Sequence, residues 1–187
     1  MSTAMITTPL VDIATAQRDN RIEAGAQFAR NGRLCCIMPS FNYGRFIETA
    51  LDSVLAQTRP ADEVIVIDDG STDGTLEKLA KYAGRVRVVR NAKNLGLSAT
   101  RNRAIALTDC EYVISIDADD WCEPQYFETL TRALDEDPSL GVVYAGVKVW
   151  LDQAGAFANQ PMHWPPAFSW GWMAQRANPP RTCIPAS

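Results

Sequence analysis

The chain has 187 residues, of which 47% are hydrophobic and 21% are charged, and its formal net charge is −4 at neutral pH. These values are typical of one globular domain with a hydrophobic core. They exclude a strongly basic nucleic-acid-binding protein, and no apolar run approaches the roughly 20 residues that cross a bilayer. We therefore expect a cytoplasmic protein, and peripheral attachment to the inner face of a membrane remains open.

Residues 1–32 are polar and lack a clear hydrophobic period, so we expect a flexible leader with a short helix near 14–29. From residue 33 onward, short apolar strands alternate with amphipathic helices. The expected strands are 34–38, ended by Pro39, and then 63–67, 86–89, 112–116 and 142–150. The expected helices are about 44–57, a short one around 76–80, 98–107, and one with Pro124 in its first turn.

This alternation predicts an α/β fold with a mostly parallel sheet covered on both faces. Right-handed connections place the loops that lead into helices at the carboxyl ends of the strands. Several polar residues directly follow predicted strands and should therefore lie at one edge of the sheet. They are Asn42, Asp68, Asp69, Asp117, Asp119 and Asp120.

The most distinctive of these segments is Asp117-Ala118-Asp119-Asp120. Adjacent carboxylates repel one another, so the cluster is costly unless a cation shares it. Oxygen ligands suit Mg²⁺ or Mn²⁺, and such an ion can bridge carboxylates and a diphosphate. The alternative is that Asp119 or Asp120 caps the following helix. We interpret the cluster as a metal and nucleotide site because one cap does not require three carboxylates.

Two further segments carry polar side chains to the same edge. In Asp68–Gly74, a carboxylate can accept the imide N–H of a uracil or bind ribose hydroxyls, and Asp73 can cap the next helix. In Asn94–Asn102, Arg101 either contacts a phosphate or the acidic cluster, or is an exposed helix residue. The sequence leaves these alternatives open.

The cysteines and the histidine predict no metal centre. The chain has five cysteines without a C-x-x-C pair, and Cys35 and Cys36 lie in an apolar strand, where buried thiols are expected. A lone histidine, His163, cannot build a histidine-based metal site. Residues 151–187 are rich in Pro and Trp, and aromatic side chains favour burial over plain disorder.

Five segments, taken in order, resemble the nucleotide-binding part of a family 2 inverting glycosyltransferase with the GT-A fold. They are Ile37–Asn42, Ser53–Thr58, Val64–Thr75, Asn94–Asn102 and Ile116–Asp120. The resemblance covers about residues 33–147. It implies a Rossmann-like α/β/α sandwich over residues 33–150, a nucleotide-sugar donor that is usually UDP-linked, and Mn²⁺ or Mg²⁺ as cofactor.

The resemblance also implies roles for individual residues. Pro39, Ser40 and Asn42 would border the nucleoside, and Asp69 would meet the base with Asp68 beside it. Asp117 and Asp119, on either side of Ala118, resemble the family's D-x-D pair, which binds ribose and the metal-diphosphate. Asp119 and Asp120 are the candidate metal ligands, and Arg101 is a further candidate for donor binding.

The family's general base, which takes the proton of the acceptor hydroxyl, lies in a later acceptor-binding segment. None of the acids after Asp120 matches that motif; they are Glu123, Glu128, Asp135, Glu136, Asp137 and Asp152. Residues 178–185 resemble the lead into that segment. We therefore expect residues 151–187 to begin an acceptor-side region, a fold truncated at its C-terminus, and a base beyond Ser187.

The residues and the resemblance together indicate two possible functions for this chain. The first is inverting transfer of a sugar to a hydroxyl of a carbohydrate, a lipid-linked molecule or a protein. The alternative is a donor-binding module with little transfer. A nucleotidyltransferase would need a basic Gly-rich loop, which Ser40–Arg45 matches poorly, and the dinucleotide-binding pattern G-x-G-x-x-G is absent there.

Overall fold

The computed structural model describes residues 32–138, 140–145, 150–151, 156–157 and 181–185. The predicted leader with its helix near 14–29, and His163 with most of the Pro- and Trp-rich region, lie outside the described residues.

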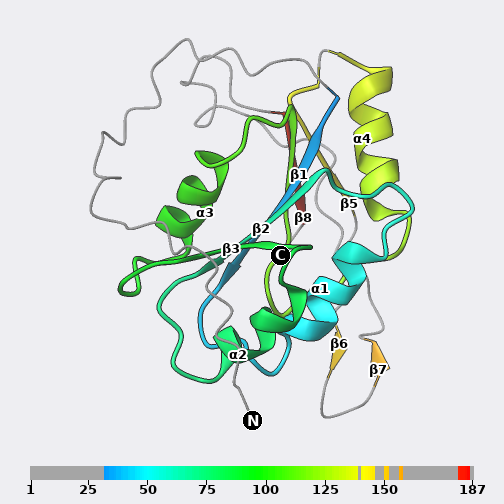
Figure 1. Cartoon of the computed structure of the whole chain (residues 1–187). Helices are drawn as coiled ribbons and strands as arrows, with labels where there is room; N and C mark the ends of the chain where they lie inside the picture. Colours follow the sequence, from blue (N-terminus) through cyan, green and yellow to red (C-terminus); the bar gives the residue numbers. More distant parts are fainter. Residues whose placement is uncertain (1–31, 139, 146–149, 152–155, 158–180, 186–187) are drawn as a thin grey trace.

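A six-stranded sheet with the order β3-β2-β1-β4-β8-β5 forms the centre of the fold (Figure 1). All of its neighbouring strands are parallel, which confirms the predicted α/β class. Its strands are β1 (Leu34–Ser40), β2 (Glu63–Asp68), β3 (Arg87–Arg90), β4 (Tyr112–Ser115), β5 (Val142–Ala145) and β8 (Arg181–Pro185). A small antiparallel pair consists of β6 (Trp150–Leu151) and β7 (Ala156–Phe157).

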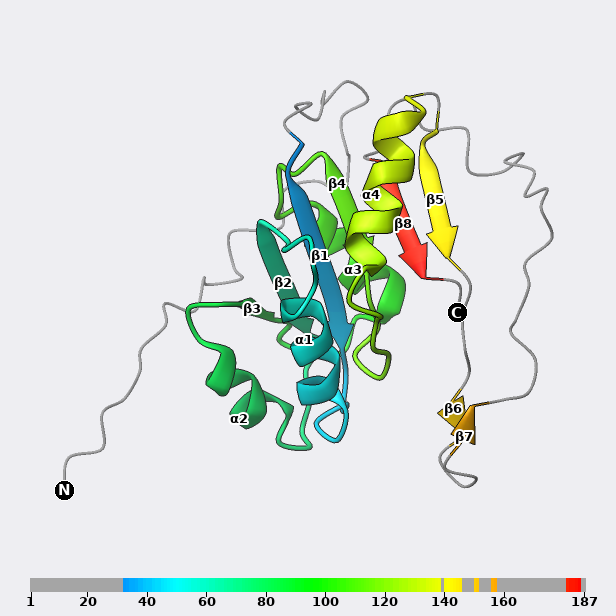
Figure 2. The same ribbon diagram turned by 90° about the vertical axis from the view of Figure 1, so that its right-hand side faces the viewer.

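Helices cover both faces of this sheet (Figures 1 and 2). They are α1 (Ile47–Leu55), α2 (Thr75–Leu79) with the 3-10 turn η2 (Ala80–Tyr82), α3 (Leu97–Ile105) and α4 (Tyr126–Glu136). Alternate residues of β1 serve opposite faces: Cys36 and Met38 pack in the core with α1 and α4, whereas Cys35 and Ile37 pack with Ala104 of α3. Burial on both faces explains why these strands are continuously apolar.

The expected buried thiols of β1 are confirmed. The side chains of Cys35 and Cys36 are fully buried between the sheet and its helices. Burial raises the pKa of Cys35 to about 12. Both cysteines are therefore core residues in the protonated form.

The observed elements differ from the prediction at several boundaries. Strand β1 continues through Pro39 to Ser40 instead of ending at Pro39. Proline has no N–H to donate, but the pairing of β1 with β4 already ends at Ile37, so Pro39 interrupts no hydrogen bond to β4. Helix α4 begins at Tyr126, so Pro124 precedes the helix instead of lying in its first turn. Strand β5 ends at Ala145 instead of extending to residue 150.

Strand β8 was not expected from the sequence. It lies between β4 and β5 and pairs with both, with Val113 and Val143 opposite Thr182 and Cys183. The segment has five residues and ends in proline, so its strand signal is weak. Its position shows that part of the region after residue 150 completes the sheet.

The strand order creates a topological switch point at the carboxyl edge. The chain runs outward from β1 to β2 and β3 and then returns to β4 on the other side of β1. Ligands of open α/β sheets bind at such switch points. The segments that follow β1 and β4, which are Phe41–Tyr43 and Ile116–Asp120, flank this switch point. None of the helices in the described part of the chain is long and apolar enough to span a membrane.

Candidate functional site

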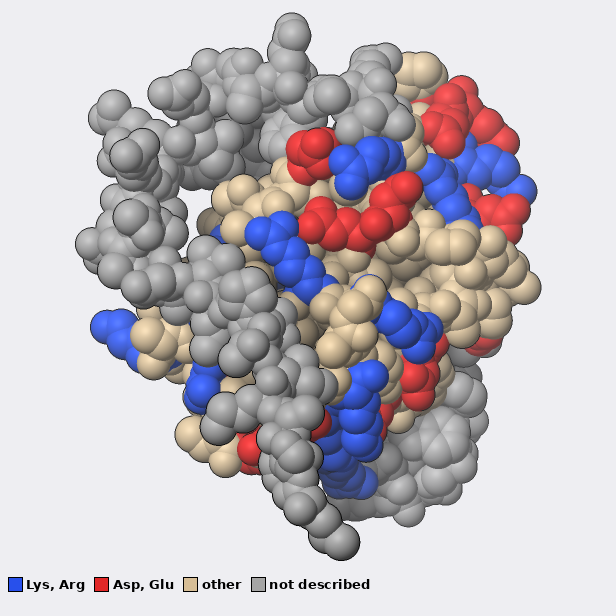
Figure 3. Space-filling model, viewed as in Figure 1, with Lys and Arg blue, Asp and Glu red and all other residues tan. Residues whose placement is uncertain are grey.

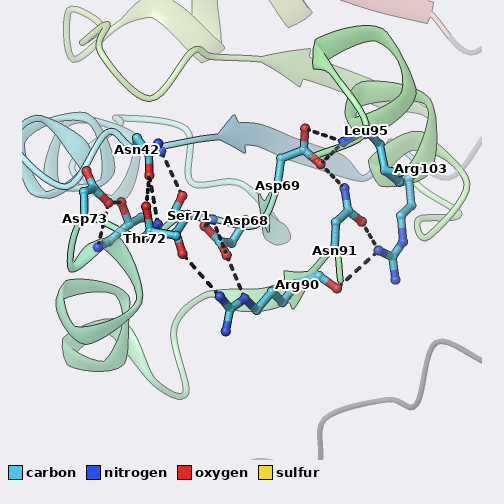
Figure 4. Close-up of polar contacts among 11 residues, drawn as sticks. Asn42, Asp68, Asp69, Ser71, Thr72, Asp73, Arg90, Asn91, Leu95 and Arg103 are labelled. Carbon is cyan, nitrogen blue, oxygen red and sulfur yellow. Dashed lines mark hydrogen bonds and ion pairs between the residues drawn. The ribbon is translucent and has the colours of Figure 1, made fainter. Parts of the chain in front are cut away.

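The loops after β1 and β2 are joined by hydrogen bonds (Figure 4). Asn42 has a left-handed backbone (φ 59°), which asparagine tolerates better than most residues. Its N–H donates to Ser71 Oγ at 2.8 Å, and its side-chain oxygen accepts from the Thr72 N–H at 2.9 Å. The Gly44 N–H donates to Asp73 Oδ2 at 2.8 Å. These bonds hold two of the predicted segments together at the carboxyl edge.

Asp68 and Asp69 point in different directions from the end of β2 (Figure 4). Asp68 is fully buried, accepts from the Ser71 N–H at 3.2 Å, and pairs with Arg90 Nε at 3.3 Å. Asp68 therefore stabilises the turn after β2, and its charge is compensated by Arg90.

Asp69 organises the loop before α3. Only 3% of this residue is exposed, and its carboxylate accepts from Asn91 Nδ2 at 2.5 Å and from the N–H groups of Leu95 and Gly96 at 2.9 Å each. Burial raises the pKa of Asp69, but the hydrogen bonds from Asn91, Leu95 and Gly96 outweigh burial and lower this pKa below its ordinary value. Both oxygens thus have protein donors, and direct contact with a base stays a prediction.

Asn91 connects Asp69 to helix α3. It is 1% exposed, and its Nδ2 lies 3.3 Å from Thr100 Oγ1 in addition to its bond with Asp69. Arg103 donates to the side-chain oxygen of Asn91 and, at 3.3 Å, to the carbonyl of Arg90 (Figure 4). Asn91 was not among the residues predicted from the sequence, although a polar residue two positions after the predicted strand 86–89 was an available signal.

The acidic turn after β4 is closed by a hydrogen bond from the Asp120 N–H to the Asp117 carbonyl at 3.0 Å. Ala118 is fully buried, Asp117 is half-buried, and Asp119 and Asp120 are exposed. Arg101 of α3 pairs with Asp117 (Nη2 to Oδ1, 2.5 Å), so Arg101 contacts the acidic cluster. Its buried Nε has no hydrogen-bond partner among the described residues, and phosphate contact stays a prediction.

Negative charge at this turn exceeds the nearby positive charge. The pKa of Asp120 is raised first by partial desolvation of its carboxyl group in the folded state and then by the charges of Asp119 and Asp117, while Arg101 lowers it. The pKa of Tyr43 is raised as well, chiefly by the charge of Asp119. Tyr43 follows β1, which pairs with β4 up to Ile37 and Ser115, so the two loops that flank the switch point begin side by side.

The capping alternative for Asp119 and Asp120 does not hold. Helix α4 begins at Tyr126, and the side-chain oxygen of Gln57 accepts from the Phe127 N–H at 3.0 Å in its first turn. The exposed carboxylates of Asp119 and Asp120 therefore do not cap helix α4.

The acidic turn fits a divalent ion that takes part of its ligands from a substrate. Within the described residues, no three His, Cys, Asp or Glu side chains are grouped closely enough to hold a metal. Mg²⁺ is commonly held by one or two carboxylates together with substrate phosphates and water. Asp119 and Asp120 offer such a partial, all-oxygen ligand set.

The remaining predicted residues lie at the same edge. Pro39 and Ser40 end β1 and are buried; Ser40 is 3% exposed, and its Oγ has no hydrogen-bond partner among the described residues. On the face seen in Figure 3, acidic and basic side chains are interspersed.

We expect the protein to lose stability in acid. The pKa values of Asp69 and Asp73 are lowered in the folded state, because hydrogen bonds outweigh burial at both. Their contribution is present above the unfolded pKa of about 4 and is lost as the pH falls through the folded values. Thermal unfolding measured between neutral and acidic pH should show this loss, and Asp73→Asn should reduce it. An unchanged pH dependence in Asp73→Asn would contradict the assignment.

The fold is that of known glycosyltransferases with the GT-A architecture. TarS of Staphylococcus aureus (residues 1–349), solved in complex with UDP-GlcNAc, has a TM-score of 0.55 and 28% identity over 60% of this chain and 34% of its own. The mannosyltransferase PcManGT of Pyrobaculum calidifontis, in complex with GDP-Man and Mn²⁺, has a TM-score of 0.54 and 30% identity over 60% of this chain and 35% of its own. The predicted GT-A sheet is thereby confirmed.

The chain belongs to glycosyl transferase family 2, whose model matches residues 35–169. An uncharacterized glycosyltransferase of Escherichia coli K12, YibD, is 42% identical over 110 residues, which are 56% of this chain and 31% of that protein. The E. coli chondroitin synthase is 34% identical over 68% of this chain and 19% of its own length. The chain thus spans about a third of YibD and less of the synthase.

Proposed function

We propose that this chain binds the donor of an inverting glycosyltransferase, with a UDP-sugar as donor and a hydroxyl group as acceptor. One observation carries the proposal: the exposed Asp119 and Asp120 lie on the turn after β4, at the switch point, and β4 pairs directly with β1. The complexes of TarS with UDP-GlcNAc and of PcManGT with GDP-Man and Mn²⁺ support a nucleotide-sugar donor. A cytoplasmic location, with or without peripheral membrane attachment, is part of this proposal.

The nucleoside would lie against the ends of β1 and β2. Pro39, Ser40 and Asn42 border that position, and the unpartnered Ser40 hydroxyl is a buried group that a ligand can satisfy. Asp69 would act on the base directly or through the Leu95–Gly96 amides that it orients. Asp68 would keep the turn beside it in place.

The diphosphate would lie over the acidic turn. Asp117 would bind ribose, and Arg101 would contact phosphate while it holds Asp117. Each carboxylate would repel a phosphate charge by roughly 4 kcal/mol at about 4 Å for an effective dielectric constant of ~20, so binding requires a cation. Asp119 and Asp120 would hold Mn²⁺ or Mg²⁺, which neutralises charge on the departing diphosphate when it is bound.

Transfer requires a base that takes the proton of the acceptor hydroxyl. Three of the later acids already have partners around α4. Glu128 accepts from Thr58 at 2.7 Å, Asp135 contacts Tyr112 and Arg59, and Glu136 lies 3.9 Å from Arg132. This observation favours, as the second candidate, a donor-binding part with little transfer of its own.

Calorimetric titration with UDP tests the proposal. We expect UDP to bind this chain more tightly with Mn²⁺ than with a chelator, because the ion removes the repulsion between the acidic turn and the diphosphate. GDP serves as the control for base selectivity. Equal UDP affinity with and without the metal would contradict the metal-assisted donor site. Transfer itself is measured as release of UDP from UDP-sugars.

A further inference from the structure

One of the five segments that resemble the family's motifs has no part in the proposed donor site. This segment is Ser53–Thr58, at the end of α1. Its three polar residues, Ser53, Gln57 and Thr58, all bind the segment that directly follows the acidic turn. That segment is residues 122–128, and the residues in it that Gln57 contacts are 65–70 positions away from Gln57 in the sequence.

Gln57 is the centre of these contacts. It is 6% exposed, and its Nε2 donates to the Glu123 carbonyl at 2.9 Å, to the Ser53 carbonyl at 3.0 Å and to Cys122 Sγ at 3.3 Å. Its Oε1 accepts from the Phe127 N–H at 3.0 Å. A side-chain amide has two N–H groups and one carbonyl oxygen, so every polar atom of Gln57 is engaged.

Ser53 and Thr58 bind the same segment on either side of Gln57. The Cys122 N–H donates to Ser53 Oγ at 3.2 Å, while Ser53 itself donates to the Ala50 carbonyl at 2.8 Å. The Thr58 N–H donates to the Pro124 carbonyl at 2.8 Å. We call these three residues the α1 clamp.

The helix that carries the α1 clamp is packed into the hydrophobic core. Helix α1 buries Ile47, Leu51 and Val54 in the core, so its C-terminal end cannot move without disturbing the sheet packing. The acidic turn is held at its start by strand β4 and the buried Ala118, and at its end by the clamp on Cys122. Asp119 and Asp120 lie between these two anchors.

We propose that Gln57 is a positioning residue for the acidic turn and that it acts through the Cys122–Phe127 segment to set where Asp119 and Asp120 present their carboxylates. The expected effect of Gln57 on metal binding rests on the proposed function. A glutamine with both donors and acceptors engaged fixes the segment more tightly than one contact does. Groups that orient metal-binding side chains change metal affinity without touching the metal.

The test compares Gln57→Met with Tyr82→Phe. Methionine keeps a similar side-chain length and removes the amide. Tyr82→Phe removes another hydrogen bond to helix α1, from the Tyr82 hydroxyl to Asp52 Oδ1 at 2.9 Å, which does not involve residues 122–128. The first readout is hydrogen exchange of the Asp120 amide, which closes the acidic turn. The second is the UDP affinity with Mn²⁺ and with a chelator.

In Gln57→Met we expect faster exchange of the Asp120 amide and a loss of about tenfold or more in Mn²⁺ affinity at saturating UDP. UDP affinity in the chelator should stay within about twofold, since the nucleoside loops do not contact Gln57. Tyr82→Phe should change neither readout. An unchanged Asp120 exchange rate and Mn²⁺ affinity in folded Gln57→Met would overturn the proposal.

If Gln57→Met does not fold, Ser53→Ala replaces it, because it removes one hydroxyl of the same clamp and leaves the glutamine. The expected result is again faster Asp120 exchange, and an unchanged rate again overturns the proposal. A wild-type chain that shows no Mn²⁺ effect on UDP binding contradicts the proposed function instead. The exchange measurement on Gln57→Met then still decides whether the clamp positions the turn.

Discussion

Replacement of both Asp119 and Asp120 by asparagine should abolish the Mn²⁺-dependent part of UDP binding. The two exposed carboxylates are the candidate ligands, and a neutral amide oxygen binds a hard divalent ion more weakly than a carboxylate does. Calorimetry with UDP in Mn²⁺ and in chelator measures this effect. UDP affinity in the chelator should rise slightly, because two negative charges near the diphosphate are removed.

The matched control carries the same change in net charge at a distance from the turn. Glu77→Gln with Glu136→Gln alters exposed residues of α2 and α4. This control should keep the Mn²⁺ effect. A Mn²⁺ effect that survives in the Asp119/Asp120 variant would show that the metal site lies elsewhere.

The same variant should be more stable than the wild type in the absence of metal. The folded state raises the pKa of Asp120, through partial desolvation of its carboxyl group first and then through Asp119 and Asp117, so it disfavours the charged form. Stability from such a group is present below the unfolded pKa and is lost as the pH rises through the folded pKa. A higher melting temperature at neutral pH, combined with lost metal binding, separates a functional defect from misfolding.

The second large effect is expected for Asp69→Asn. Asparagine replaces one carboxylate oxygen by an N–H₂ group, which would face either Asn91 and the Leu95 N–H or the Gly96 N–H, and all of these are donors. The loss of hydrogen bonds to a buried charge should lower the free energy of unfolding by about 3 kcal/mol. For a chain of this length, the melting temperature should fall by about 6–12 °C. UDP binding should weaken as well, because the Leu95–Gly96 loop loses its anchor.

Asp62→Asn is the control for the chemistry of the substitution. Asp62 is exposed and accepts one backbone N–H, from Leu34 at 2.8 Å, which an asparagine oxygen can also accept. Its cost should stay at about 1 kcal/mol or less. If both variants lose the same stability, then the buried network around Asp69 contributes no more than a surface contact.

Much of the fold and of the site was predictable from local patterns. Alternating apolar strands and amphipathic helices predicted the parallel sheet, and the position of Asn42, Asp68 and Asp117 after strands predicted one shared edge. These inferences succeed because the period of side-chain burial and the direction of parallel strands are local or topological properties.

The remaining features depend on partners distant in sequence. Nothing local shows that Gln57 binds a segment 65–70 residues later, or that Asn91 lies between Asp69 and Thr100. Strand β8 shows the same limit, because a short segment that ends in proline becomes a strand only when β4 and β5 lie on either side of it. Such contacts are properties of the assembled fold.

The position of β8 also has a consequence for the order of folding. In the described sheet, β5 is an edge strand whose neighbour is β8, and β8 separates it from β4. On the ribosome, residues 181–185 emerge after the rest of the sheet, so β4 keeps an open, apolar edge until nearly the whole described chain has been synthesised. Open edges of this kind favour pairing with other chains. Completion of the described sheet thus depends on a segment that is synthesised after β5, and the open edge of β4 closes when β8 pairs with it.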